Sequence, residues 1–288
     1  MIYYMDWCFV LGNDAAVCLA EFVGENIEGF AKLMNEKANQ LGLENTHFVT
    51  PHGLDVEEHY TTAFELAKLT NYALKNETFA KIVGTRTYTV TINKTPKAIN
   101  NTNELLGNLN GVYGVKTGFT NGANRCLVTA CKRNNLDVIC VVLGADTKKF
   151  RTQDSIKLIE YSFKTFTPVD VQSLVNEKFE QWKKENINCF EIIKGQTQNV
   201  EIKISPLKFS TIPINNNLIK DIKITIDCKQ ILEAPILENT CLGKIGVYVG
   251  NEHLTSCDIL LNSTILKKDI SDYFVEIIKG LKTSFASF

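Results

Sequence analysis

The sequence lacks the signatures of several protein classes. No two of its nine cysteines form a C-x-x-C pair, which argues against the common kind of zinc site. No run reaches the ~18 apolar residues of a transmembrane helix. The formal net charge is only −1, so no overall field attracts the chain to nucleic acid. We therefore expect no metal, no cofactor and no nucleic acid among its ligands.

The composition is that of an ordinary folded protein. Of the 288 residues, 44% are hydrophobic and 22% are charged, values close to the averages of globular domains. Because a domain typically holds about 100–200 residues, the length suits one large domain or two smaller ones.

Periodicity predicts a mixture of helices and strands in the first half. Apolar residues recur every three or four positions over 26–41, which indicates an amphipathic helix. The capping-box pattern of Thr62 and Glu65 starts another helix. Turns of Asn-Gly and Asn-Asn separate three runs that predict an antiparallel meander: 112–120, 125–132 and 137–143. A helix is expected to follow, over about 148–166.

The character of the chain changes after Pro168. Short β-like runs follow, spaced by glycine, asparagine and proline, which is typical of a small β sandwich. The last twenty residues return to a helical period. We expect a first domain over 1–166, an all-β domain over 167–268 and an amphipathic helix over 269–288.

The motif with the most chemical meaning is Lys116-Thr117-Gly118. Three common residues occur together by chance, so K-T-G alone is a weak signal. Here the motif lies within a predicted strand, a hairpin follows it, and the segment NTNELL at 101–106 precedes it. This context favours a functional site.

Several further stretches carry a family resemblance: GNDAA at 12–16, LMNEK at 33–37, NTHF at 45–48, PHGL at 51–54, GVKTG at 114–118 and VVLG at 141–144. With them, residues 12–166 resemble the penicillin-binding serine acyltransferase domain in its D-alanyl-D-alanine carboxypeptidase branch. The later region, with EAP at 233–235 and GKIG at 243–246, is similar to the C-terminal β domain of that branch. The resemblance implies an α+β, β-lactamase/transpeptidase-like fold.

The resemblance also implies a mechanism with three motifs, S-x-x-K, S-x-N and K-T-G. The first serine attacks the D-Ala-D-Ala carbonyl and its lysine takes the proton, because a serine alone is a poor nucleophile. Carried over to this chain, Lys116 and Asn13 are catalytic residues. Thr117 and Gly118 bind the substrate, whose extended backbone pairs with the strand.

Two further substrate contacts follow from the resemblance. The backbone N–H of Phe119 supplies half of an oxyanion hole, and the nucleophile's own N–H supplies the other half. Arg151 matches an arginine that pairs with the terminal carboxylate of the substrate, as bidentate guanidinium geometry allows. The alternative for Arg151 is a solvated side chain at the start of a helix.

The sequence departs from the family pattern at two places. Leu11 stands where the S-x-N serine is expected, and leucine cannot relay a proton. The one S-x-x-K in the chain, Ser205 to Lys208, follows K-T-G and contains a proline, so we interpret it as chance. We expect a chain truncated before the nucleophile, with Met1 an internal methionine, and therefore inactive. β-Lactams would bind only with the missing N-terminal segment present.

Two other groups of residues have more than one interpretation. His47, His52 and His59 suggest a metal cluster only superficially, because their spacing fits no metal motif; His52 fits a turn-shaping role.

Residues 270–285 place apolar side chains on one helical face, with lysines off it, so this helix either lies on a membrane surface or packs on its own β domain. The family favours the extracytoplasmic face of a bacterial membrane.

Three functions remain in competition. The first is trimming of the terminal D-alanine from peptidoglycan stem peptides. The second is a non-catalytic relative that binds cell-wall peptides, which Leu11 favours because truncation does not explain a changed residue. The third is a β-lactamase, against which the second domain and the tail argue.

Overall fold

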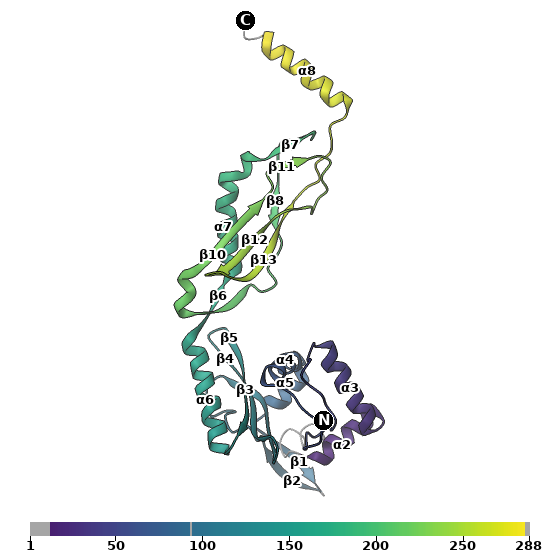
Figure 1. Cartoon of the computed structure of the whole chain (residues 1–288), viewed down its shortest axis with the longest axis vertical. Helices are drawn as coiled ribbons and strands as arrows, with labels where there is room; N and C mark the ends of the chain where they lie inside the picture. Colours follow the sequence, from purple (N-terminus) through teal and green to yellow (C-terminus); the bar gives the residue numbers. More distant parts are fainter. Residues whose placement is uncertain (1–11, 93, 286–288) are drawn as a thin grey trace. The chain divides into compact units, whose positions relative to one another are not determined.

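The computed structural model of the chain describes residues 12–92 and 94–285. The chain divides into two compact units, and the division falls between Thr165 and Phe166. Both units combine helices with mainly antiparallel sheets (Figure 1), the pair of β7 and β11 being parallel, so the predicted α+β class is confirmed. Leu11, which stands in place of the S-x-N serine, lies outside the described residues.

Four helices open the first unit: α2 (Asn13–Gly24), α3 (Ile27–Gln40), α4 (Ala63–Ala73) and α5 (Glu77–Gly84). Asn26 caps α3, since its side chain accepts a hydrogen bond from Gly29 N at 2.7 Å. The Thr62 hydroxyl caps α4 in the same way, from Glu65 N at 3.2 Å. The amphipathic helix and the cap of the next one are therefore confirmed.

Only half of the predicted capping box forms at α4. In a complete capping box the Glu65 carboxylate would accept a hydrogen bond from Thr62 N. Here it accepts hydrogen bonds from Asn45 N at 3.0 Å and from the Thr46 hydroxyl instead. Burial raises the pKa of this carboxyl, but the hydrogen bonds from Thr46 and Asn45 outweigh burial and lower it. Glu65 therefore anchors the following loop instead of its own helix.

The meander forms as predicted, as a three-stranded sheet in the order β3-β4-β5. Its strands are β3 (Val112–Thr120), β4 (Asn124–Arg133) and β5 (Leu136–Ala145). Asn134 and Asn135 join the last two with φ of 47° and 63°, the left-handed conformations of a two-residue hairpin turn. Strand β3 is an edge strand, and β1 (Thr87–Ile92) and β2 (Thr95–Asn100) form a separate hairpin.

Helices cover both faces of this sheet, and Figure 1 shows them on either side. On one face, Val83 of α5 packs with Val115 and Ala130 of the sheet. On the other, Ile159 of α6 (Lys148–Thr165) packs with Leu127. All five side chains are at most 5% exposed. With both faces buried, the edges of the sheet remain for a ligand, and β3 forms one of them.

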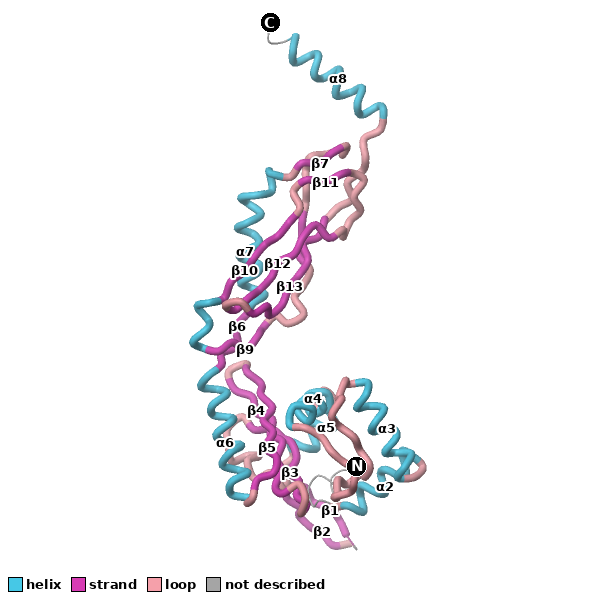
Figure 2. Tube along the Cα trace, in the orientation of Figure 1, coloured by secondary structure: helices cyan, strands magenta, loops and turns pink. Residues whose placement is uncertain are grey.

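The second unit is not purely β, which corrects the sequence-based expectation. Helix α7 (Val171–Asn186) packs against its four-stranded sheet (Figure 2), and Val171, Val175 and Phe179 join the core. The signal was present in the sequence: these apolar residues recur every four positions, and Asp170 caps the helix by accepting from Ser173 N at 3.0 Å. The nearby Pro168 obscured this pattern because it indicated a strand-rich region.

The sheets of this unit are built from short strands. The main sheet has the order β10-β12-β13-β8, with β10 (Ile222–Cys228), β12 (Cys241–Val249), β13 (Glu252–Leu261) and β8 (Ile202–Ile204). Two-stranded pairs complete it: β6 (Phe166–Asp170) with β9 (Thr211–Asn215), and β7 (Glu191–Ile193) with β11 (Ile231–Glu233). Two 3-10 turns, Ile187–Cys189 and Asn216–Asp221, connect these elements.

Helix α8 (Ile270–Phe285) ends the described chain. Its apolar side chains are exposed as far as they are described: Ile270 is 78% exposed, Phe274 64% and Ile277 60%. Residues 270–278 thus lie outside the described core clusters, and both alternatives for this helix stay predictions. No helix within the described residues is long and apolar enough to cross a bilayer.

Candidate functional site

The K-T-G residues lie in the middle of β3, on the open edge of the sheet. The Thr117 side chain is buried, 5% exposed, whereas Lys116 is partly exposed and its ammonium donates to the carbonyl of Thr117 at 2.6 Å. Within the described residues, a methyl group at Gly118 would contact Cys126 at 3.7 Å. This is an ordinary van der Waals distance, so the described packing leaves room for a side chain at this position.

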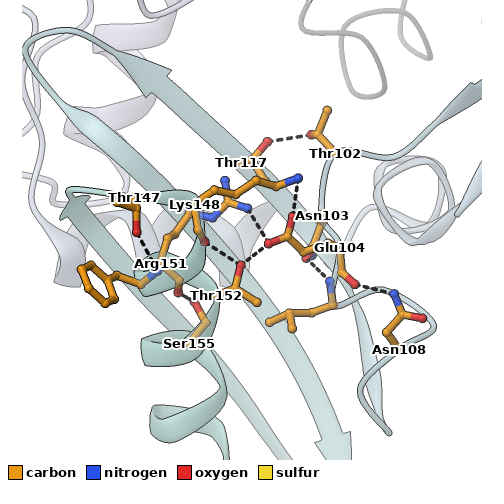
Figure 3. Close-up of polar contacts among 12 residues, drawn as sticks. Thr102, Asn103, Glu104, Asn108, Thr117, Thr147, Lys148, Arg151, Thr152 and Ser155 are labelled. Carbon is orange, nitrogen blue, oxygen red and sulfur yellow. Dashed lines mark hydrogen bonds and ion pairs between the residues drawn. The ribbon is translucent and has the colours of Figure 1, made fainter.

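A second segment lies against K-T-G, and motif reasoning did not assign it a role. The hydroxyl of Thr102 is 2.6 Å from the hydroxyl of Thr117 (Figure 3). One of the two hydroxyls donates, and the other keeps its proton for a further partner. Thr102 thus helps to set the orientation of Thr117 within the site.

Asparagine side chains hold this segment in place. Asn103 is 2% exposed and donates from Nδ2 to the carbonyl of Gly114 at 2.9 Å. Asn101 donates from Nδ2 to the carbonyls of Val83 and Thr85, at 3.2 and 3.1 Å. Amide side chains can serve as both donor and acceptor, so they replace the regular ladder that the segment lacks. The asparagine-rich run at 100–103 was the available signal.

Arg151 is buried, which rules out the solvated alternative. It is 3% exposed, and its Nη2 lies 3.3 Å from Oε1 of Glu104. Oε2 of the same carboxylate lies 2.7 Å from the ammonium of Lys148, and the Thr152 hydroxyl also contacts Glu104. Figure 3 shows Glu104 facing these side chains of α6 while Thr102, two residues earlier, faces Thr117.

The surroundings of Glu104 favour its ionised form. Partial burial would raise the pKa of this carboxyl, but Lys148, Thr152 and Arg151 together lower it below its ordinary value. The carboxylate therefore stays charged at neutral pH and remains a partner for the buried guanidinium.

The remaining predicted site residues are placed separately. Phe119 is 47% exposed, and the guanidinium of Arg125 stacks on its ring at 3.9 Å. Asn13 is the exposed first residue of α2 and not its cap, which is Gly12. Strand β3 thus brings Lys116, Thr117, Gly118 and Phe119 together, and Glu104 links them to Arg151. The approach of Asn13 to Lys116 stays a prediction.

The histidines of the loop act in local turns. Nδ1 of His52 accepts from Leu54 N at 3.2 Å, which agrees with the turn-shaping role, and Nδ1 of His59 accepts from Val49 N at 3.0 Å. Burial, with His47 and His52 nearby, lowers the pKa of His59. Among the described residues, no group of three histidine, cysteine or acidic side chains is arranged to hold a metal ion.

The described serines at 155 and 205 do not form an S-x-x-K pair of serine and lysine on one helical turn. No serine precedes Ser155 in the sequence. Ser155 is 1% exposed and donates to the carbonyl of Arg151 at 2.8 Å within α6. Ser205 belongs to the second unit, where its Oγ accepts from Asp258 N at 2.9 Å, and residues 205–208 form no helix. The Ser205 hydroxyl and Lys208 therefore lack the one-turn helical spacing that S-x-x-K requires.

Comparison with known proteins agrees with these features. A family model described as D-alanyl-D-alanine carboxypeptidase matches residues 7–147. DacF of Bacillus subtilis is 32% identical over 91% of this chain and 67% of its own length. DacA of Haemophilus influenzae is 30% identical over 94% of this chain and 67% of its own. The structure of penicillin binding protein 5 from Haemophilus influenzae aligns with a TM-score of 0.67 at 26% identity, over 89% of this chain and 71% of that one.

The Glu104–Arg151 pair generates a stability prediction. Glu104→Gln should lower the free energy of unfolding at neutral pH by on the order of 3 kcal/mol, because it leaves a buried guanidinium without its counter-charge. The lowered pKa means that wild-type Glu104 contributes above the ordinary carboxyl pKa, and that this contribution is lost as the pH falls through the folded-state value. Urea unfolding of the whole chain at neutral and acid pH should show the difference shrink in acid.

Glu160→Gln is the matched control. It removes a carboxylate that is 51% exposed and that pairs with Arg133 at 2.9 Å, and it should change stability by at most about 1 kcal/mol. Equal effects of the two substitutions at neutral pH would contradict the assignment of Glu104 as the counter-ion of a buried charge.

Proposed function

The chain belongs to the D-alanyl-D-alanine carboxypeptidase family, and we propose that strand β3 receives the D-Ala-D-Ala end of a peptidoglycan stem peptide as the substrate of that reaction. The observation that carries the proposal is the K-T-G sequence on the open edge of a sheet whose two faces are buried. An extended peptide can add to such an edge through main-chain hydrogen bonds.

The residues of β3 divide the recognition between them. The Lys116 ammonium supplies positive charge beside the reacting peptide, and the hydroxyl pair of Thr117 and Thr102 offers a hydrogen bond. The backbone N–H of Phe119 is the donor for the oxyanion that forms when the terminal amide is attacked. In the family reaction a serine ester with the stem peptide forms, D-alanine leaves, and water hydrolyses the ester.

The same residues do not by themselves perform that attack. The first unit has no serine before Ser155, so we infer that this 288-residue chain binds the peptide end without cleaving it. Leu11, in place of the S-x-N serine, favours a second candidate function, a non-catalytic binder of cell-wall peptides. A β-lactamase function would need a serine that forms an ester with the drug, and the lack of a serine before Ser155 argues against it as well.

We further propose that the chain works at the extracytoplasmic face of a bacterial membrane, with α8 on the lipid surface. The support is the row of exposed apolar side chains over 270–278, together with lysines at 267, 268, 279 and 282 in the sequence. Apolar burial stabilises such binding by roughly 25 cal/mol per Å². Each lysine adds on the order of 1 kcal/mol at an anionic surface.

Peptide binding tests the main proposal. The chain should bind a peptide that ends in D-Ala-D-Ala in preference to the same peptide ending in L-Ala-L-Ala, as measured by calorimetry. Lys116→Ala should weaken binding at least about tenfold, because a charge-assisted hydrogen bond contributes about 1.5–3 kcal/mol. Lys97→Ala, on exposed β2, is the control and should leave affinity unchanged. Equal binding of both peptides would exclude this function.

The absence of covalent reaction is a separate prediction. Incubated with a fluorescent penicillin and run on a denaturing gel, the chain should give no labelled band at its mass of 32.3 kDa. The physical reason is that no serine beside K-T-G has a lysine one helical turn away to take its proton. A labelled band would refute the inference, and label mapped to Ser205 would restore that residue as a candidate.

Vesicle co-sedimentation tests the role of α8. The chain should sediment with vesicles that contain phosphatidylglycerol, and the double variant Phe274→Asp, Ile277→Asp should remain in the supernatant because charge on the apolar face opposes insertion. Leu237→Asp is the matched control: it alters a side chain that is 69% exposed in the second unit but outside the helix. If all three proteins sedimented to the same extent, the proposal that α8 binds the lipid surface would be wrong.

A further inference from the structure

The guanidinium of Arg151 has donors that are buried and unused. The residue is 3% exposed, yet its Nε and Nη2 make no hydrogen bond within the described part of the chain. Its one charged partner there is Glu104, at 3.3 Å from Nη2. A buried donor without an acceptor is destabilising, so this guanidinium can accommodate a further anionic acceptor.

The charges around Arg151 do not cancel. Lys148 and Arg151 carry two positive charges, Glu104 carries one negative charge, and the cluster is left with a net charge of +1. Lys148 is the exposed member, at 64% of its side chain, whereas Glu104 is 29% exposed and Arg151 only 4%. The carboxylate thus pairs at once with the deep guanidinium and with the solvent-facing ammonium.

This cluster is tied to the peptide-binding strand by a short piece of chain. Thr102 contacts Thr117 of K-T-G, and Glu104, two residues later, contacts Arg151 (Figure 3). Asn103 between them is 2% exposed and bonded to Gly114 of the same strand, so the two contacts are held in fixed relation. A ligand carboxylate at the end of a peptide on β3 would therefore compete with the Glu104 carboxylate for the Arg151 guanidinium.

We propose that the Glu104 carboxylate competes with the C-terminal carboxylate of a bound peptide for the Arg151 guanidinium. Glu104 thereby sets how strongly this site prefers peptides with a free C-terminal carboxylate. The inference rests on the proposed function, since it concerns the peptide bound at K-T-G. Glu104 acts here through Arg151 and is a specificity-determining residue. Its removal frees the guanidinium and raises the local charge from +1 to +2.

The test compares two ligands on two proteins. Affinities of a D-Ala-D-Ala peptide and of its C-terminal amide are measured by calorimetry for the wild-type chain and for Glu104→Gln. The ratio of the two affinities should shift toward the free carboxylate by roughly tenfold in the variant, since the ligand no longer competes with an internal carboxylate. A merely structural role of Glu104 would change both affinities by the same factor and would overturn the proposal.

Controls and a second variant keep the outcome decisive. Glu160→Gln removes a carboxylate elsewhere on α6 and should leave the ratio at its wild-type value. If Glu104→Gln does not fold, Lys148→Ala at an exposed position serves in its place. It should lower the preference for the carboxylate severalfold, because it strengthens the hold of Glu104 on Arg151; an unchanged ratio would count against the inference.

A readout without peptide separates this inference from the proposed function. Sulfate should raise the unfolding temperature of Glu104→Gln more than that of the wild type or of Glu160→Gln, because it can occupy the vacated arginine. If no protein binds either peptide but this difference appears, the proposed function fails and the role of Glu104 as internal carboxylate stands. Equal stabilisation of all three proteins by sulfate would overturn it.

Discussion

The burial of one guanidinium constrains the whole candidate site. Arg151 lies beneath the surface at the start of α6, and a charge in that position requires a carboxylate beside it. Glu104 meets the requirement from a segment that has no regular secondary structure. Once Glu104 is fixed on α6, Thr102 and Asn103 are fixed on β3, and the orientation of Thr117 follows. The ion pair therefore joins three elements that the backbone ladders alone leave separate.

The sheet explains why the site lies where it does. Apolar side chains of α5 and α6 cover the two faces of β3-β4-β5, and hydrophobic burial on this scale leaves only edges for polar chemistry. The β3 edge presents main-chain groups, and Lys116, Thr117 and the N–H of Phe119 lie along it. Recognition of an extended peptide end needs no more than this arrangement. Bond cleavage needs an activated nucleophile as well, and no serine precedes Ser155 in the sequence.

The second unit builds its hydrophobic core differently from the first. Its strands are short, and helix α7 supplies three fully or nearly fully buried side chains to the core. A sheet covered on one face by a helix needs fewer strands than a sandwich of two sheets. Helix α8 contrasts with α7, because its described apolar side chains, over 270–278, are exposed.

The sequence by itself determined the elements whose signal is local. Runs separated by turn residues placed β3, β4 and β5, apolar periodicity placed α3, and the Thr62 cap placed α4. K-T-G with its neighbouring stretches indicated the family. Helix α7 was not predicted, although its buried apolar residues recur every four positions. The nearby Pro168 indicated strands and turns in this region. Only the tertiary structure decided that Arg151 is buried, that Glu104 neutralises it and that Thr102 touches Thr117. The reason is physical: these contacts join residues up to 47 positions apart, as Glu104 and Arg151 are, and neither propensity nor periodicity describes which distant side chains share one buried charge.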